Sequence, residues 1–547
     1  MPRVAMSKAK AIEPASSRAR SVTLAGPAHE VWQQFEARGE HESRQDWLTS
    51  NLRGAIVAGA LQPGARLPAS RQLAHELQLS RNTVAIVYER LLAEGLLEAR
   101  VGAGTFVTSH LARPRGRGSA AADNDRRLAA RVANLLPQPG DRPESDPSRP
   151  LTPGLPDLDL FPHALWARLN TRYWRARPSL GYTDPAGLPA LRQAISGFIG
   201  ATRGVACDPE QVFITAGTQG AMMAVFHALL EPGAQAWVED PGYRQVWRAL
   251  RMVDARPVPV PVDEHGLMVS AGHALAPKAR LAIVSPSHQY PSGALMSLPR
   301  RLALLDWAAQ SDAWILEDDY DGEYRYEGAP IKSLKSLDRD DRVIYVGTLS
   351  KLLAPGLRLG FMVVPDALVA PMRALRQTID HGMAAPVQSV FADFITQGHL
   401  GTHVRKTRAV YNERRQTVLA ALAKMPAIAS VSGSDAGLHL VARLAHGSDR
   451  AVAAQTWERG LGLTAISAYG ASAMVDLNEA QRVPSDDAVA LASALVIGYA
   501  NAGDAALDEA LARLAQCLAG AYSKRRPGRV TVSASDRTPA CPGNSPN

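Results

Sequence analysis

A series of short apolar runs, each ending in a polar turn, is the feature that most constrains how this chain folds. The runs lie between residues 151 and 520 and include QVFITAG, AQAWVED, RLAIVSPSH, AWILEDD, RVIYVGT and LGFMVV. Several are apolar at every position instead of alternating, which is typical of strands that are covered on both faces. Helical patterns separate the runs, so this part of the chain is predicted to form an α/β domain.

Composition divides the rest of the chain. Its 547 residues are too many for one ordinary domain. We expect a mobile N-terminal extension (1–40), a small domain (41–108), a linker rich in Arg, Pro, Gly and Ala (109–150), the α/β domain (151–520) and a disordered polar tail (521–547). A short helix around Leu128 to Leu136 is expected to interrupt the linker.

Three classes of protein fit the composition poorly. The three cysteines, Cys207, Cys517 and Cys541, form neither a zinc-binding spacing nor a disulfide framework. No apolar run is long enough to span a bilayer, and the N-terminus lacks the apolar core of a secretory signal. We therefore expect a cytoplasmic protein that has no membrane partner.

The segment from residue 44 to residue 107 carries the pattern of a small helical domain that ends in a hairpin. Residues 44–60 are amphipathic, and Ser70 and Ser80 are each expected to cap a helix. Leu96 to Val107 is predicted to form the hairpin, with Gly102 and Gly104 at its tip. The first predicted helix buries Trp47, Leu48, Leu52, Ile56 and Val57, and the helix after Ser80 buries Val84, Val87, Tyr88, Leu91 and Leu92.

The charge of the chain is compatible with nucleic-acid binding but does not establish it. The net charge is +8, and the first 150 residues hold 21 Lys and Arg against 15 Asp and Glu. Residues 41–108 contribute only 7 Arg against 6 acidic residues, so most of the excess lies in the flanking segments. Solvated tails explain the charge almost as well, and a DNA-binding hypothesis must rest on the helix pattern.

A lysine at the end of one apolar run is the centre of a second pattern. Lys351 follows RVIYVGT and precedes LLAPGLRLG, with Thr348, Ser350 and Arg358 nearby. An amine that forms an imine with an aldehyde cofactor needs a carboxylate against the cofactor's ring nitrogen and a phosphate site. Arg358 could bind the phosphate, and the two hydroxyl groups could assist.

The acidic run EDDYDGE supplies the carboxylate. Asp318 ends the strand AWILE, and Tyr320 could donate a hydrogen bond to the ring hydroxyl of the cofactor. The same run could instead be a solvated loop or a metal site. We expect no metal, because no histidine is interleaved with the acidic residues.

Two further turns complete the pattern. TAGTQG, residues 215–220, joins an apolar strand to an apolar helix, which is a natural place for phosphate. Tyr243 follows the next strand and could stack on the cofactor ring. In the segment SPSHQYPSG, His288 and Gln289 are possible cofactor contacts, although a purely structural loop is equally compatible.

Both patterns resemble known families. PGARLPASRQLA, SRNTV, EGLLEAR and GAGTFV resemble the GntR-type winged helix. GYTDPAGLPALRQAI, TAGTQGAM, EDPGYR, EDDYDGEYRYEG, YVGTLSKLLAPGLRLG and RAVYNERR resemble a fold-type-I aminotransferase. The combination is similar to the MocR-type (GabR-type) transcription regulators, and the likeness covers about 400 residues.

The resemblance implies a multidomain fold. It joins an α+β winged helix-turn-helix to an α/β transferase-like domain of fold type I that carries a small C-terminal α+β subdomain. It also implies a homodimer that binds pyridoxal 5'-phosphate and double-stranded promoter DNA and senses the cofactor or a small amine or amino-acid effector.

The resemblance assigns roles to individual residues. Lys351 would carry the imine, and Asp318 is preferred over Asp319 for the ring nitrogen. The remaining cofactor contacts would be Gly217, Thr218, Gln219, Tyr243, Tyr320, Thr348, Ser350 and Arg358. The DNA contacts would be Arg71, Ser80, Arg81, Asn82, Thr83, Gly102 and Gly104, with Arg66 a weaker candidate.

One departure from the aminotransferase pattern bears on activity. The late strand ALVIGYA, residues 494–500, has no Arg to bind a substrate carboxylate, and only Tyr469 is aromatic in SAYGASAM. Arg244 or Arg482 could take that role. A working aminotransferase with an accessory DNA-binding domain, and a repressor whose enzyme-like domain is only a dimerisation scaffold, remain alternatives.

Overall fold

The computed structural model describes residues 31–32, 35–39, 42–109, 129–133, 135, 146–175, 181–328, 331–433, 435–471 and 493–523. The chain separates into two compact units, residues 1–127 and 128–547, and each is described by itself. The predicted N-terminal extension and C-terminal tail lie almost wholly outside the described residues, as does most of the predicted linker. Among the described residues, no helix combines the length and apolar character that a bilayer crossing requires.

The described part of the first unit contains helices that pack together with a two-stranded hairpin. Its elements are α2 (Arg44–Val57), α3 (Ser70–Glu76), α4 (Arg81–Ala93), β1 (Leu97–Arg100) and β2 (Gly104–Val107). The two strands pair antiparallel, with Leu97 opposite Val107. One core joins all five elements and contains Leu48, Leu52, Ile56, Leu73, Val84, Val87, Tyr88, Leu91, Leu97 and Val107.

Most of the sequence pattern of this unit is confirmed. Ser80 caps α4, since its Oγ accepts a hydrogen bond from the Thr83 N–H at 3.0 Å. The expectation for Ser70 was wrong, because Ser70 is the first residue of α3 and Ala69 occupies the cap position without a side-chain bond. Val57 was also wrongly placed in the core, because it lies at the end of α2 and is 52% exposed.

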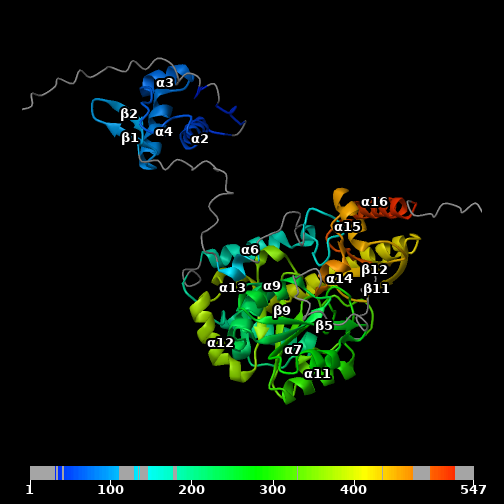
Figure 1. Ribbon diagram of the computed structural model, residues 1–547. Coiled ribbons are helices and arrows are strands. Elements are labelled where there is room, and N and C mark those ends of the chain that lie inside the picture. The colour runs from blue at the N-terminus through cyan, green and yellow to red at the C-terminus, as the bar shows by residue number, and fades with distance from the viewer. Residues whose placement is uncertain are drawn as a thin grey trace, which may run out of the picture. The chain divides into compact units, whose positions relative to one another are not determined.

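The second unit is built around an eight-stranded sheet in the order β3-β10-β9-β8-β7-β4-β5-β6. Figure 1 shows β9 and β5 of this sheet among the surrounding helices. The strands are β3 (Val212–Thr215), β4 (Gln235–Asp240), β5 (Arg256–Asp263), β6 (Gly266–Leu267), β7 (Leu281–Val284), β8 (Trp314–Asp319), β9 (Val343–Thr348) and β10 (Gly360–Val363). Strands β9, β8, β7, β4 and β5 run parallel, and β10 is antiparallel to both of its neighbours.

Helices cover both faces of this sheet, as the uninterrupted apolar runs predict. The helices of the second unit are α5 (Ala130–Ala133), α6 (His163–Trp174), α7 (Pro189–Arg203), α8 (Gly217–Leu229), α9 (Arg244–Met252), α10 (Val269–Leu275), α11 (Leu298–Gln310), α12 (Asp366–Ile379), α13 (Ala385–Thr396), α14 (His399–Leu422), α15 (Asp449–Glu458) and α16 (Asp504–Ser523). Alternate strand residues enter different cores. Ile283 and Ile344 pack with α8 and α9, whereas Ala282 and Ile315 pack with α11.

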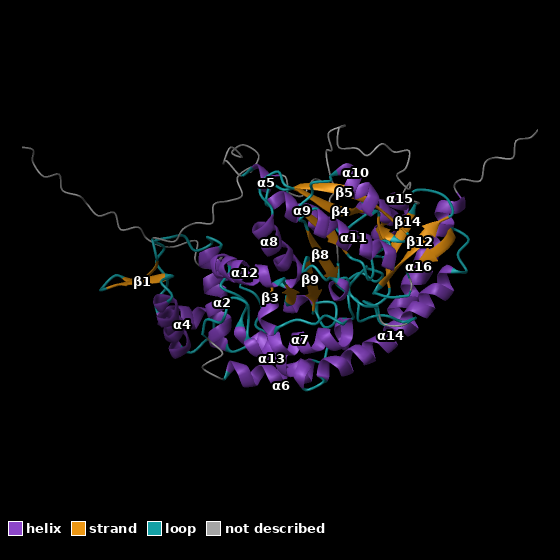
Figure 2. Ribbon diagram, turned by 90° about the horizontal axis from the view of Figure 1, so that it is seen from below, coloured by secondary structure: helices purple, strands orange, loops and turns teal. Residues whose placement is uncertain are grey.

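A smaller antiparallel sheet follows, in the order β11-β12-β14-β13. Its strands are β11 (Ile428–Ser432), β12 (His439–Leu444), β13 (Thr464–Ala465) and β14 (Ala494–Gly498). Figure 1 shows these strands grouped with α15 and α16 at one end of the unit, and Figure 2 shows the long helix α14 reaching them from the side of the large sheet. The predicted small C-terminal subdomain is therefore present.

Candidate functional site

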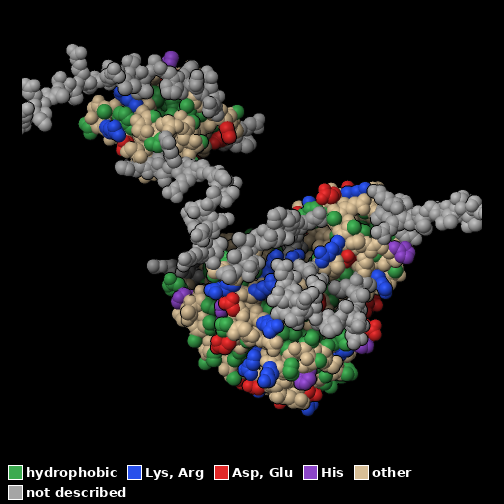
Figure 3. Space-filling view, in the orientation of Figure 1, with side chains coloured by type: hydrophobic (Ala, Val, Ile, Leu, Met, Phe, Trp, Pro, Cys, Tyr) green, Lys and Arg blue, Asp and Glu red, His purple; other side chains and the backbone are tan. Residues whose placement is uncertain are grey.

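The first candidate site is the exposed surface of α4 and the hairpin. Arg71, Ser80, Arg81 and Asn82 are exposed, and Thr83 is half-buried at the first turn of α4. A helix whose N-terminal residues are exposed can offer them to a DNA groove. Figure 3 shows Lys and Arg side chains on the surface beside the β1–β2 hairpin.

The hairpin turn depends on its glycines. Gly102 and Gly104 have φ angles of 74° and 112°, which residues with a Cβ rarely adopt. A Cβ on Gly104 would lie only 3.1 Å from Nε of Arg66, so the structure brings this weaker candidate against the hairpin. Sequence reasoning missed Arg100, whose guanidinium lies 4.5 Å from the centre of the Phe106 ring in the same hairpin.

The second candidate site is a cavity of about 250 Å³ at the carboxyl ends of the parallel strands. All ten residues predicted to bind the cofactor line it: Gly217, Thr218, Gln219, Tyr243, Asp318, Tyr320, Thr348, Ser350, Lys351 and Arg358. Six lining positions that the sequence analysis did not assign to the cofactor are Pro153, Gly154, Leu155, Tyr290, Pro355 and Tyr469. The ten predicted residues come from five separate segments of the chain, and the fold brings these segments together around one cavity.

Lys351 lies just beyond β9, and its amine faces the cavity. Nζ donates a hydrogen bond to the Gly154 carbonyl at 2.7 Å. Burial lowers the pKa of Lys351, although the charges of Asp321 and Asp318 oppose that shift. A lowered pKa makes the neutral, nucleophilic amine more available.

The two neighbouring aspartates have different environments. Asp318 is 7% exposed, and within the described part of the chain its Oδ1 has no hydrogen-bond partner. Asp319 is already engaged, because it accepts from Nε of Arg203 and from the Tyr345 hydroxyl, each at 2.6 Å. Burial and, next, the charge of Asp319 raise the pKa of Asp318 to about 7. A protonated pyridine nitrogen would supply the cation that this carboxylate lacks.

A cradle for an anion lies at the other end of the cavity. A Cβ on Gly217 would lie 3.7 Å from the guanidinium carbon of Arg358, so this cation lies over the first turn of α8. Arg358 donates to the Ala216 carbonyl at 3.2 Å, and the buried Ser350 Oγ has no partner among the described residues. A positive side chain, a helix N-terminus and a hydroxyl suit a phosphate group.

Tyrosines form the remaining wall. The Tyr290 and Tyr469 hydroxyls lie 2.8 Å apart, and the Tyr469 hydroxyl also lies 2.9 Å from Oγ1 of Thr464. The Tyr243 ring meets the Tyr290 ring edge to face at 6.1 Å. Tyr469 belongs to the C-terminal subdomain, so the cavity lies between the two sheets.

Some suggested contacts do not reach this cavity. The Gln289 amide donates to Glu239, Pro241 and Tyr290, which makes it a structural residue. His288 lies behind Tyr320 and does not line the cavity. Arg244 is not among the described residues that line it, and Arg482 lies outside the described residues.

The chain matches two family models. Residues 155–493 match aminotransferase class I and II, and residues 47–107 match the bacterial regulatory proteins of the gntR family. A probable rhizopine catabolism regulatory protein, MocR, from Rhizobium meliloti is 40% identical over 400 residues, covering 72% of this chain and 80% of that protein.

Two further relatives carry names of regulators. The transcriptional regulator TauR of Rhodobacter capsulatus is 34% identical over 496 residues, covering 88% of this chain and 98% of that protein. The pyridoxine biosynthesis transcriptional regulator PdxR of Corynebacterium glutamicum is 31% identical over 426 residues, covering 77% of this chain and 88% of that protein. An archaeal alanine:glyoxylate aminotransferase structure is 25% identical with a TM-score of 0.63 and covers 73% of this chain and 98% of its own.

Proposed function

Because the chain belongs to the MocR-type regulators, in which a GntR helix-turn-helix domain is joined to an aminotransferase class I and II domain, we propose that it is a cytoplasmic, cofactor-linked regulator of transcription. The winged-helix unit (41–108) binds promoter DNA. The aminotransferase-like unit (151–520) holds pyridoxal 5'-phosphate on Lys351. Residues 109–150 link the two.

The observation that carries the proposal is the fit of the cavity to this cofactor. Asp318 would face the ring nitrogen, Arg358 with Thr348 and Ser350 would hold the phosphate, and Tyr243 would lie against the ring. When bound, the cofactor supplies an aldehyde carbon that Lys351 and then an amine ligand can occupy in turn. The side chains of the cavity would bind and orient the cofactor and would balance the charges of its ring nitrogen and its phosphate.

Regulation requires a ligand that binds one arrangement of the two units better than another. A small amine or amino acid that replaces Lys351 on the cofactor is the effector class that this cavity accommodates. Its tyrosine wall joins the large sheet to the C-terminal subdomain through the Tyr290–Tyr469 contact, so a ligand there contacts both.

A homodimer is part of the proposal. The Tyr182 side chain is 98% exposed, and its ring lies 6.2 Å from that of His381, close in sequence to Ile379, which is 52% exposed. Exposed aromatic and aliphatic side chains of this size commonly mark a protein interface. Two winged helices would also double the DNA footprint. Light scattering of the full chain is expected to give twice the mass of 58.5 kDa.

The test is a footprint on the DNA upstream of the protein's own gene, with and without pyridoxal phosphate, for wild type and Lys351→Ala. A footprint that the cofactor changes in wild type but not in the variant supports the proposal. A footprint that is indifferent to cofactor contradicts a cofactor-linked regulator and favours a scaffold. Turnover of an amine with a 2-oxo acid, without any footprint at this or a second promoter, favours an aminotransferase.

A further inference from the structure

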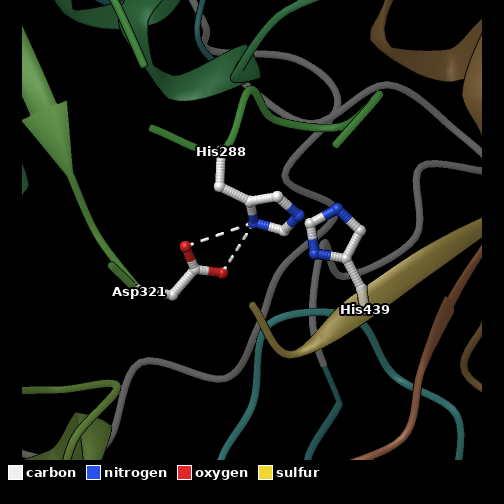
Figure 4. A group of neighbouring side chains, drawn as sticks. All are labelled: His288, Asp321 and His439. Atoms are coloured by element: carbon white, nitrogen blue, oxygen red, sulfur yellow. Dashed lines mark hydrogen bonds and ion pairs between the residues drawn. The ribbon is translucent and has the colours of Figure 1, made fainter. Parts of the chain in front are cut away.

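Three buried side chains meet directly behind Tyr320. His288 follows β7, Asp321 follows β8 and His439 begins β12, and they are 4%, 1% and 0% exposed. One donor atom from each lies within 4.8 Å of the other two. Figure 4 shows the two imidazole rings side by side, with the Asp321 carboxylate on the far side of His288.

Hydrogen bonds fix where the protons of this cluster lie. Nδ1 of His288 is 3.0 and 3.2 Å from the two carboxylate oxygens of Asp321. Nε2 of His439 is 3.1 Å from the Pro291 carbonyl oxygen. Because a carbonyl oxygen only accepts, Nε2 of His439 must carry a hydrogen, and its Nδ1 is then unprotonated when the ring is neutral.

The two histidines have opposite charge preferences. Burial alone lowers the pKa of His288, but the charge and hydrogen bond of Asp321 outweigh it and raise that pKa. Burial, followed by the positive charge of His288, holds the pKa of His439 well below its ordinary value. The surroundings therefore favour the imidazolium form of His288, paired with Asp321, and the neutral form of His439.

Glycines make room for the charged ring. A Cβ on Gly437 would lie 2.1 Å from Cε1 of His288, and a Cβ on Gly293 would lie 2.3 Å from Cα of Gly433. Both distances are far shorter than any van der Waals contact. The backbone on two sides of His288 therefore fits this ring closely and fixes its position.

The imidazolium is also in contact with Tyr320. Nδ1 of His288 also lies 3.1 Å from the Tyr320 hydroxyl oxygen, so the one hydrogen on Nδ1 is shared between this oxygen and the Asp321 carboxylate. The hydroxyl hydrogen of Tyr320 then points away from His288 and is available for another hydrogen bond. The Tyr320 side chain lines the cavity together with Asp318 and Lys351.

We infer that Asp321 and His288 are positioning residues that hold the Tyr320 hydroxyl as a hydrogen-bond donor toward the ring oxygen of the bound cofactor. This inference rests on the proposed function, because it requires pyridoxal phosphate in the cavity. The donor and the cation behind it both stabilise negative charge on that oxygen. Both therefore lower the pH at which the cofactor's visible absorption band titrates.

A divalent metal ion is the other occupant that two imidazoles and a carboxylate could hold. The hydrogen bonds of His288 to Asp321 and of His439 to Pro291 use one nitrogen of each ring. Nε2 of His288 and Nδ1 of His439 have no partner among the described residues and could bind a metal ion, whereas the raised pKa of His288 favours a proton. The metal is therefore an outcome that the experiment must distinguish.

Other charged and titratable groups face the same residues. Those near His288 are Arg325 and His439, those near Tyr320 are Asp318, Glu239 and Tyr290, and Lys351 faces Asp321. All of them except His439 stay in place in every comparison below.

The experiment titrates the visible band of the full-length, cofactor-loaded protein in wild type, His288→Asn, Asp321→Asn and Tyr320→Phe. His288→Asn and Tyr320→Phe are each expected to raise the pH midpoint by roughly one unit and to weaken cofactor binding by roughly tenfold. Asp321→Asn removes the counter-charge of His288 but also a negative charge that raises the pKa of Lys351, so its midpoint is expected to rise less. In the double variant His288→Asn with Tyr320→Phe, the shifts are expected to be less than additive, because one residue acts through the other. His439→Gln is the matched control, since His439 is buried in the same cluster without a bond to Tyr320, and its midpoint is expected to stay unchanged.

Three outcomes would overturn the inference. The first is an unchanged midpoint in His288→Asn. The second is a set of fully additive shifts, and the third is about one bound metal ion per chain that EDTA removes and His439→Gln abolishes. If His288→Asn fails to fold, His288→Gln decides, because it removes the same charge with a longer neutral side chain. A wild-type protein that shows no visible band with the cofactor contradicts the proposed function itself, whereas a wild-type band with indifferent variants contradicts only this inference.

Discussion

The winged-helix unit carries its candidate contacts outside its core, whereas the second unit buries them. Arg71, Arg81 and Asn82 are exposed, and the residues that hold their helices together are different ones, such as Val84 and Leu91. In the cavity, Asp318, Thr348 and Ser350 are each less than 9% exposed, and two of their oxygens lack a partner within the described structure.

This difference determines how each site is linked to stability. An exposed contact can be removed without leaving a buried group unpaired, so only binding changes. A buried, unpaired carboxylate destabilises the folded chain until a ligand pairs with it. The second site should therefore affect unfolding and ligand binding together, and the first should affect binding alone.

The largest expected effect is the loss of the cofactor link in Lys351→Ala. No other amine among the described residues lines the cavity, so the visible band should disappear completely, and borohydride should no longer fix the cofactor to the chain. Lys335→Ala is a control, because Lys335 pairs with Asp338 and Asp341 away from the cavity. A retained covalent adduct in Lys351→Ala would show that the cavity has been assigned to the wrong lysine.

The next largest contrast is between two adjacent carboxylates. Asp319→Asn leaves the buried Arg203 without its counter-ion and should cost about 3–5 kcal/mol of unfolding free energy. Asp318→Asn should loosen the cofactor more but stabilise the cofactor-free protein at neutral pH. Chemical denaturation with and without cofactor measures both effects, and the reverse ranking for cofactor affinity would assign the ring nitrogen to Asp319.

The pH dependence of that contrast follows from the raised pKa of Asp318. The folded chain prefers the protonated carboxyl, so its contribution to stability is complete below about pH 4 and is lost as pH rises toward about 7. In Asp318→Asn, the unfolding free energy should lack this part of its decline with pH. The difference between the wild-type and variant curves therefore gives the contribution of Asp318 apart from those of Glu239 and Glu317, whose pKa values burial also raises.

A smaller effect is expected at the DNA surface. Arg81→Ala should weaken operator binding by about 1–3 kcal/mol, flatten the salt dependence and leave the cofactor spectrum and unfolding free energy unchanged. Arg90→Ala is the matched control, because Arg90 lies at the other end of α4 and pairs with Asp46. If the two variants bind the operator equally well, the first turn of α4 does not enter the groove.

The smallest effect concerns helix capping. Ser80→Ala removes the bond to the Thr83 N–H and should destabilise the winged-helix unit by about 1 kcal/mol. Ser70→Ala should change its stability by less than half of that, because Ser70 makes no capping bond. Hydrogen exchange of the α3 and α4 amides separates the two, and equal effects would contradict the assigned cap.

Local patterns predicted the strands, the α4 cap and the cavity's polar residues, because these depend on neighbours in sequence. The run EDDYDGE shows where that approach ends. It was treated as one acidic block, but its aspartates have separate partners: Asp318 faces the cavity, Asp319 binds Arg203 and Asp321 binds His288. Neighbouring residues of a strand point to opposite faces, so a cluster in sequence is not a cluster in space.

The contacts that the sequence analysis did not find come from packing between segments that are far apart in the chain. Tyr469 meets Tyr290 across 179 residues, and His439 bonds to Pro291 across 148. Only the docking of the C-terminal subdomain against the large sheet brings these pairs together, and no local spacing encodes it. The Ser70 error is of a different kind, since the helix begins at Ser70, one residue earlier than a cap at Ser70 would require.

The hydrogen bond from Lys351 to Gly154 has a consequence for communication within the chain. Gly154 belongs to the stretch that follows residues 109–150, and the carbonyls of Pro150 and Leu151 in that stretch accept hydrogen bonds from Gly462 and Gly498 of the C-terminal subdomain. A nitrogen that forms an imine has fewer hydrogens to donate, so bonding to an aldehyde and bonding to Gly154 compete for the same atom. Occupancy of Lys351 therefore changes the hydrogen bonding of Gly154, in the stretch that follows residues 109–150.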